Sequence, residues 1–166
     1  MHTLDEVRAE YERLDKLLGI NTSHIELKIS KRAVHRLGSF RASTPPCITL
    51  SELVMADDAL FMDTLRHEYA HAVVHLLRPG ERHGHDVVWK NICRRIGCRA
   101  QSRTELTETA ARMRDEKTKY IVRCKLCGNE NAYLRRGKVV DMLQRGRGHR
   151  LRCAHCGGNK FELITK

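Results

Sequence analysis

The chain has 166 residues, and its 31 Lys and Arg outnumber its 20 Asp and Glu, which gives a formal net charge of +11. A chain of this length forms one or two small domains, and none of its apolar runs is long enough to span a bilayer. Its first residues lack the basic and apolar stretches of a secretory signal. Four of the seven cysteines stand in C-x-x-C pairs, which favours a reducing compartment over a disulfide scaffold. We therefore expect a cytoplasmic protein that is neither secreted nor inserted in a membrane.

The N-terminal part of the chain switches from a helical to a strand-like pattern. Apolar residues at helical spacing predict an amphipathic helix over 4–19. Alternating apolar and polar residues then predict three short strands, at 25–29, 34–41 and 47–50. Helices and strands in this order predict an α+β domain.

A long helix is predicted after these strands. Asp57 or Asp58 can cap its start, and Pro79-Gly80 ends it. Apolar residues recur on one side of this helix at helical spacing: Phe61, Leu65, Tyr69, Ala72 and Leu76. We expect this side to pack in a core, whereas His67 and His71 lie off the apolar side.

Residues 67–71 read His-Glu-Tyr-Ala-His, which is an H-E-x-x-H motif within the predicted helix. Residues four apart lie one turn from each other, so the imidazoles of His67 and His71 can bind one metal ion. The carboxylate of Glu68 lies beside them, where it can accept a proton from a water at the metal. The alternative is a solvated helix face that carries these residue types by chance. The motif favours a catalytic zinc site, which needs one further protein ligand.

Four side chains after the motif are candidates for the third ligand: His75, Glu81, His83 and His85. His75 lies on the motif helix, and a rigid helix does not easily bring ligands from three successive turns to one tetrahedral ion. The loop 79–84 allows the chain to turn back, and a second helix is predicted to begin near Asp86. His83 and His85 are therefore better placed, and the residues alone leave both open.

The C-terminal part carries two C-x-x-C knuckles, each followed by Gly. Their sulfur atoms belong to Cys124, Cys127, Cys153 and Cys156. Two thiolate pairs at this spacing make a tetrahedral structural zinc site, and the Gly permits the tight turn that such a site needs. Strand-like runs at 132–134 and 150–152 lie between and beside the knuckles. The pattern predicts a small β zinc ribbon over 119–166, with redox or disulfide pairs as the alternative.

Residues 101–118 are polar and are predicted to link two domains, with one helix from Thr104 to Lys117. The expected architecture is a minimal zincin-like metalloprotease domain at 1–100, a partly helical linker at 101–118, and the zinc ribbon at 119–166. This architecture requires two zinc ions, one catalytic and one structural.

The positive charge is concentrated in the predicted ribbon. Residues 117–166 hold 13 Lys and Arg against three Asp and Glu, and thus carry ten of the eleven net charges. Seven of these basic residues cluster between the knuckles: Arg135, Arg136, Lys138, Arg145, Arg147, Arg150 and Arg152. A small basic domain of this kind predicts contacts with a phosphate backbone. A cationic surface without a ligand is the alternative.

The motif at 67–71, followed by Gly84-His85-Asp86-Val87-Val88-Trp89-Lys90, resembles the SprT-like, Spartan-related family of zinc metalloproteases. In that family the third zinc ligand is a His four residues before an aromatic residue on the next helix. Trp89 stands four residues after His85, so the resemblance implies that His85 is the ligand. His83 is the second choice, because Gly often follows the ligand directly in the family. The predicted C-terminal zinc ribbon also resembles the family, because many of its proteins carry such a ribbon after the H-E-x-x-H domain.

The resemblance implies a zinc-dependent metallopeptidase that hydrolyses peptide bonds in proteins bound or crosslinked to DNA. His67, His71 and His85 would bind the catalytic zinc, and Glu68 would be the general base. The expected partners are DNA and protein substrates, with the chain acting as a monomer in the cytoplasm, nucleoid or nucleus. A competing hypothesis is a DNA-binding or transcription-associated zinc-ribbon protein whose H-E-x-x-H site is not catalytic.

Overall fold

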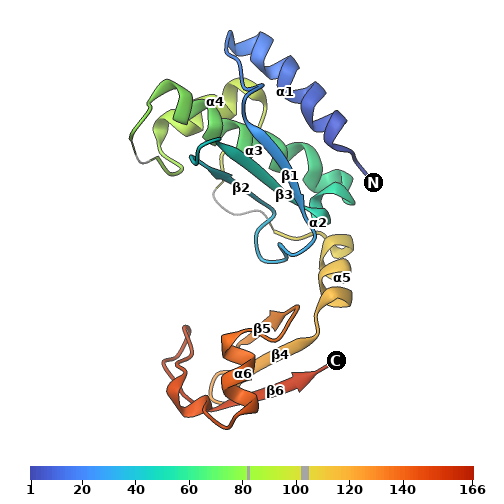
Figure 1. Ribbon diagram of the computed structural model, residues 1–166, viewed down its shortest axis with the longest axis vertical. Helices are drawn as coiled ribbons and strands as arrows, with labels where there is room; N and C mark the ends of the chain where they lie inside the picture. The colour runs from blue at the N-terminus through green and yellow to red at the C-terminus, as the bar shows by residue number, and fades with distance from the viewer. Residues whose placement is uncertain (82, 102–104) are drawn as a thin grey trace. The chain divides into compact units, whose positions relative to one another are not determined.

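The computed structural model describes residues 1–81, 83–101 and 105–166, which divide into two compact units, Met1–Ala111 and Arg112–Lys166 (Figure 1). Helices and two separate three-stranded sheets make up these residues, which confirms the predicted α+β class. Thr104, the predicted start of the linker helix, lies outside the described residues, as does Arg82 of the loop after the motif helix. The linker helix is α5 (Glu108–Lys117), and the boundary between the two units falls within it.

Helix α1 (Leu4–Leu18) is capped at both ends. Thr3 and Glu6 form a capping box, in which the Thr3 hydroxyl accepts from the Glu6 amide and the Glu6 carboxylate accepts from the Thr3 amide. Gly19 ends the helix in the left-handed conformation, with φ of 69°. As the helical spacing of its apolar residues predicts, one face of α1 is buried, and its apolar members are Val7, Tyr11 and Leu14.

The sheet of unit 1 places β3 (Cys47–Ser51) between β1 (Glu26–Ser30) and β2 (Gly38–Arg41). β1 runs parallel to β3, whereas β2 runs antiparallel to it. β2 is therefore an edge strand, because its second edge pairs with no strand in the described part of the chain. Helix α3 packs against both β2 and β3, and this packing brings the edge strand to the H-E-x-x-H motif.

Strand β2 is shorter than the strand predicted over 34–41, because it begins only at Gly38. The chain before it turns instead of pairing. The Ser30 hydroxyl accepts a hydrogen bond from the Ala33 amide, and the Ser51 hydroxyl donates one to the Ala33 carbonyl. These side-chain bonds replace the sheet ladder locally, so Val34 is buried without belonging to a strand.

Three helices follow β3 in unit 1. α2 (Glu52–Met55) is a single turn, and α3 (Asp58–Leu77) begins at Asp57, whose carboxylate accepts from the Leu60 amide. α4 (Val87–Ile96) is capped by Asp86 in the same manner. No helix among the described residues is both long and apolar enough to cross a membrane.

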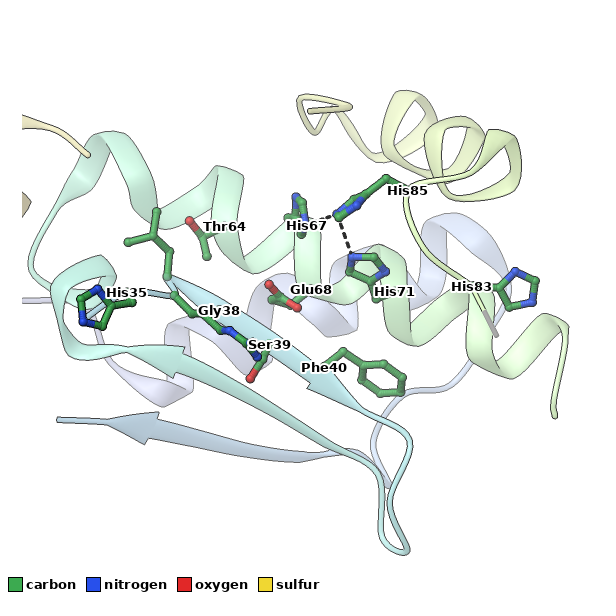
Figure 2. Close-up of a pocket in the computed structure, with 12 residues that line it drawn as sticks. His35, Gly38, Ser39, Phe40, Thr64, His67, Glu68, His71, His83 and His85 are labelled. Carbon is green, nitrogen blue, oxygen red and sulfur yellow. Dashed lines mark hydrogen bonds between the residues drawn. The ribbon is translucent and has the colours of Figure 1, made fainter. Parts of the chain in front are cut away.

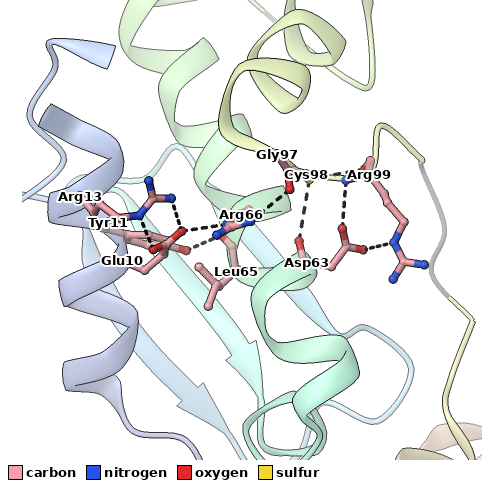
Figure 3. Close-up of polar contacts among 9 residues, drawn as sticks. All are labelled: Glu10, Tyr11, Arg13, Asp63, Leu65, Arg66, Gly97, Cys98 and Arg99. Atoms are coloured by element: carbon pink, nitrogen blue, oxygen red, sulfur yellow. Dashed lines mark hydrogen bonds and ion pairs between the residues drawn. The ribbon is translucent and has the colours of Figure 1, made fainter. Parts of the chain in front are cut away.

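Polar contacts hold the far end of α4 against α3 and α1 (Figure 3). The Arg66 guanidinium donates to the Glu10 carboxylate at 2.8 Å and to the Gly97 carbonyl at 3.1 Å. The Asp63 carboxylate accepts from the backbone amide of Arg99 at 3.0 Å. Because Arg66 directly precedes His67, this turn of α3 carries a structural contact on one side and the first histidine of the motif on the other.

Unit 2 is built on a sheet with β4 (Tyr120–Cys124) between β5 (Glu130–Tyr133) and β6 (Phe161–Thr165), all antiparallel. Helix α6 (Lys138–Gln144) lies against β6. Few side chains of this unit are buried, and the apolar and sulfur-containing ones are Val122, Val140, Cys124 and Cys153. The sheet and the four-cysteine cluster together form a zinc ribbon.

The ribbon differs from the sequence prediction at two places. The run 132–134 overlaps β5, but 150–152 is not a strand, because a 3-10 turn at Gly148–Arg150 leads directly into the second knuckle. The Arg152 guanidinium donates to the His149 carbonyl at 2.8 Å and stabilises this turn. The third strand is instead β6, and α6, which begins after Gly137, is an element that the sequence prediction lacks.

Candidate metal centres and active site

Three histidines converge on one point in unit 1 (Figure 2). His67 and His71 project from successive turns of α3, and His85 directly precedes the residue that caps α4. The Nε2 atom of His85 lies 3.1 Å from Nε2 of His67 and 3.3 Å from Nε2 of His71. Zn–N bonds of about 2.0–2.1 Å in a tetrahedron separate the nitrogens by about 3.3 Å. The three nitrogens therefore have the spacing that one zinc ion requires.

Trp89 holds the three imidazoles in place. Its side chain is fully buried, and its ring centroid lies 4.5 Å from that of His85, 4.7 Å from that of His67 and 5.2 Å from that of His71. The Asp86 carboxylate accepts from the Trp89 amide at 2.9 Å and so fixes the first turn of α4 next to His85. His85 is thus held in place because it directly precedes the cap of a well-packed helix.

The other candidates for the third ligand have different partners. Nδ1 of His83 donates to the Asp86 carboxylate at 2.9 Å, and its Nε2 lies 3.4 Å from the Glu81 carboxylate. The ring of His75 lies against Phe40, with centroids 5.4 Å apart. The structure therefore groups His85 with the motif histidines, and leaves His83, Glu81 and His75 outside that group.

Burial lowers the pKa of all three converging histidines. Burial, with a smaller contribution from the nearby imidazoles, lowers the pKa of His67 to about 4 and that of His71 to about 3. The pKa of His85 is also lowered, first by burial and then by the Lys90 charge. All three rings are neutral at pH 7, which is the form that binds a metal ion. Three converging neutral nitrogens suit a cation at their centre.

Glu68 lies on the same turn of α3, between the helix and β2 (Figure 2). Its side chain is buried, and burial raises its pKa to about 7, against the opposing effect of a hydrogen bond that the Phe40 amide donates to it. A carboxylate with a pKa near neutrality can both accept and return a proton. Its position and pKa therefore suit a general base.

The candidate site opens into a cavity of about 630 Å³. Residues 35–40 form one wall, and α3 forms the opposite wall with Thr64 and the motif residues. His83 and His85 complete the lining. A cavity of this volume accommodates a segment of polypeptide or a small molecule. The converging histidines and Glu68 thus face a space in which a substrate can bind.

A family model describes the same part of the molecule. The model of the SprT-like family matches residues 5–114, which include the sheet, the motif helix and α4. The chain belongs to the SprT-like family. This result confirms the resemblance inferred from the sequence, and it makes unit 1 a domain with a metallopeptidase-like fold. A comparison with curated proteins finds no match.

In this SprT-like protein, Gly38 leaves room for the carboxylate of Glu68. A Cβ atom at position 38 would lie 2.6 Å from both Cγ and Oε1 of Glu68 and 2.9 Å from its Cδ, and such contacts force the carboxyl group to move. Sequence reasoning did not find this contact, because it joins an edge strand to a helix 30 residues further along the chain.

We expect Gly38→Ala to reduce peptide-bond cleavage by about 100-fold, because a displacement of about 1 Å at a catalytic group has effects of this size. Metal content should stay unchanged, since position 38 touches no histidine of the site. Gly84→Ala is the matched control, because a Cβ there meets nothing within 4 Å. Initial rates and zinc content of the two variants check the prediction. Equal rates would show that the Glu68 position is not critical.

The second candidate metal centre lies beyond the residues that the SprT-like model matches. Sγ of Cys124 lies 3.6 Å from Sγ of Cys156, and Sγ of Cys127 lies 3.7 Å from Sγ of Cys153. Zn–S bonds of about 2.3 Å separate tetrahedral sulfurs by about 3.8 Å, so the four atoms fit one zinc ion. At about 2.0 Å, a disulfide would be far shorter. The three histidine nitrogens of unit 1 and the four cysteine sulfurs of unit 2 are thus both compatible with zinc.

The two knuckles of the ribbon repeat one backbone geometry. Gly128 donates to the Cys124 carbonyl at 2.9 Å, and Gly157 donates to the Cys153 carbonyl at 2.8 Å. Both glycines are left-handed, with φ of 73° and 74°. Hydrogen bonds from backbone amides to the sulfur atoms within each knuckle lower the pKa of Cys124 to about 7 and also lower the pKa of Cys153. The geometry thus favours the thiolate form of the first cysteine in each knuckle, whereas hydrogen bonds among the sulfurs and burial raise the pKa of Cys127.

The seven basic residues predicted to contact phosphates differ in their partners. Arg136 and Arg145 both form ion pairs with Asp141, each with a contact of 3.0 Å. The Arg152 guanidinium donates to backbone carbonyls. The remaining four are exposed and form no ion pair with any described residue: Arg135, Lys138, Arg147 and Arg150. Fewer basic side chains are therefore free to bind a partner than the seven that the sequence predicts.

Proposed function

We propose that this SprT-like protein is a zinc-dependent metallopeptidase that cleaves peptide bonds in proteins bound or crosslinked to DNA. The observation that carries the proposal is the convergence of the His67, His71 and His85 nitrogens beside a buried Glu68. Three protein nitrogens leave one position of a tetrahedral ion open, which is typical of catalytic and not of structural zinc. This arrangement favours catalysis over the competing hypothesis of a non-catalytic zinc-ribbon protein.

The residues of the site divide the chemistry among them. His67, His71 and His85 would hold zinc, which when bound supplies Lewis acidity toward water and a carbonyl oxygen. Glu68 accepts the proton of the attacking water through a carboxylate oxygen. Its pKa near 7 then allows it to return the proton to the nitrogen of the leaving amine. The Phe40 amide keeps the carboxylate in position during both transfers.

Strand β2 supports binding of an extended peptide. The Leu37 carbonyl accepts from the Ser51 amide, so Leu37 and Ser39 direct their backbone groups toward β3. Gly38 and Phe40 alternate with them and face the opposite way, and the Phe40 amide reaches Glu68. The Gly38 amide and carbonyl remain for a peptide that adds to the edge of the sheet. Such a peptide would pass directly over the motif.

The basic ribbon supports a role for DNA. Unit 2 carries most of the net positive charge, and its unpaired basic residues are exposed. Lys and Arg on a small domain bind phosphate backbones with an affinity that falls as salt concentration rises. A peptidase tethered in this way would act on proteins held on the same DNA.

The ion pairs at Asp141 give a prediction about DNA affinity. We expect Asp141→Asn to tighten binding of the full chain to duplex or single-stranded DNA by about five-fold, because it frees Arg136 and Arg145 for phosphates. Arg147→Glu should weaken binding by a similar factor. Fluorescence anisotropy over a series of salt concentrations measures both. If neither variant changes the affinity or its salt dependence, this surface does not bind DNA.

Digestion of a protein crosslinked to an oligonucleotide tests the proposed function as a whole. The wild-type chain loaded with zinc should cleave the crosslinked protein, and should cleave the same protein more slowly when no DNA is present. Cleavage that is equal with and without DNA would support a peptidase without a DNA requirement. No cleavage of any protein, with tight DNA binding, would instead support the non-catalytic zinc-ribbon hypothesis.

A further inference from the structure

The segment that contributes one wall of the cavity is strongly basic. Residues 31–41 include Lys31, Arg32, Arg36 and Arg41 and contain neither Asp nor Glu. Unit 1 as a whole is nearly balanced, because unit 2 carries ten of the eleven net charges. The cluster is therefore a local feature of this loop and strand, and not a consequence of a generally basic domain.

Arg36 is the residue that brings this charge into the cavity. Arg36 and the neighbouring His35 are exposed and line the cavity wall, whereas Lys31 and Arg32 do not. No carboxylate among the described residues forms a salt bridge with Arg36. An exposed guanidinium in the wall of a substrate cavity is available to pair with an acidic group of the substrate.

The opposite end of the same wall is aromatic. Phe40 lines the cavity and lies against the ring of His75. Between the two ends, Gly38 lies against the Glu68 carboxyl group. Under the proposed function, the peptide bond is cut beside this carboxyl group. The wall thus presents a cation on one side of the cleaved bond and an aromatic ring on the other.

The direction of β2 relates these ends to the substrate. β2 runs from the Arg36 end toward Phe40. A peptide that pairs with β2 in the antiparallel sense runs the opposite way, so it passes Phe40 first, then Gly38, then Arg36. Residues that follow the cleaved bond would therefore lie beside Arg36.

We propose that Arg36 is a specificity-determining residue that selects Asp or Glu within the first three residues after the cleaved bond. The inference rests on the proposed peptidase function and adds a substrate preference to it. An exposed ion pair of this kind changes selectivity by about five-fold, and the effect decreases as ionic strength rises. Binding of DNA phosphate to the same cluster is the competing use of Arg36.

Cleavage of a peptide mixture by the full-length zinc-loaded protein tests this inference, with the new termini identified by mass spectrometry. Wild type should enrich Asp and Glu about five-fold after the cleaved bond. Arg36→Gln should abolish the enrichment, and Arg36→Glu should replace it with enrichment of Lys and Arg. Arg95→Glu is the matched control, because Arg95 is exposed on α4 and does not line the cavity. It should leave the preference unchanged.

A binding measurement separates this inference from the proposed function. Fluorescent peptides that differ only in Glu or Gln at these positions are titrated against the Glu68→Gln protein, with and without Arg36→Glu. Tighter binding of the Glu peptide, lost with Arg36→Glu, supports the subsite even if wild type cleaves nothing. Cleavage without acidic enrichment, or enrichment that Arg36→Glu leaves unchanged, overturns the inference but not the peptidase function. An Arg36→Glu variant that loses DNA affinity and keeps its peptide preference also overturns it.

Discussion

Glu68→Gln should lower the rate of peptide-bond cleavage by about 1,000-fold, which is within the range for loss of a general base. The amide has nearly the same size and can still accept the hydrogen bond from Phe40, but it cannot take a proton from water. The three histidines are unchanged, so the protein should still bind two zinc ions. Initial cleavage rates and zinc content by mass spectrometry of metals measure both properties on the same samples.

Protein stability is the control for this substitution. Burial raises the pKa of Glu68 to about 7, so its ionised form is disfavoured in the folded protein and a neutral amide should not destabilise it. The thermal midpoint of the variant should therefore equal or exceed that of wild type at pH 8. A variant that is stable, holds two zinc ions and cleaves at the wild-type rate would remove Glu68 from the mechanism.

Cys124→Ser should unfold unit 2 and leave unit 1 folded. A structural zinc site contributes about 10–16 kcal/mol to the folding of a small domain, whereas whole domains are stable by about 5–15 kcal/mol. The buried set of the ribbon is too small to compensate for loss of the metal. The expected result is one zinc ion per chain and loss of DNA binding, with cleavage of a free peptide retained.

The single tryptophan separates the two units in this experiment. Trp89 is buried in unit 1, so its fluorescence reports the folding of that unit alone. Cys98→Ala is the control, because Cys98 lies outside both metal centres. It should keep two zinc ions. If Cys124→Ser also keeps two zinc ions and binds DNA normally, the four-cysteine site is not structural.

The sequence predicts the elements of this protein that depend on local spacing. The helical repeat places His67 and His71 of the H-E-x-x-H motif on one helix face, and each C-x-x-C spacing places its own two cysteines close together. The choice between His83 and His85 depends on how the loop after α3 folds. The residues alone leave it open, and the Asp86 cap and the buried Trp89 explain the position of His85.

Contacts between distant segments are harder to predict. The fit of Gly38 against Glu68 depends on β2 being an edge strand that packs on α3, which no local pattern encodes. In the ribbon, Leu151 alternates with two arginines like a strand residue, but the bonds of Arg152 and the nearby knuckle form a turn instead. The Arg136 and Arg145 pairs with Asp141 likewise reduce a charge that the composition overestimates.

Anomalous diffraction at the zinc edge, from crystals of the full chain, tests the central claim most directly. The account predicts two peaks: one bound by Nε2 of His67, His71 and His85 with solvent in the fourth position, and one bound by four cysteine sulfurs. A fourth protein side chain on the histidine-bound ion would contradict the account. So would imidazoles that point apart with no ion between them.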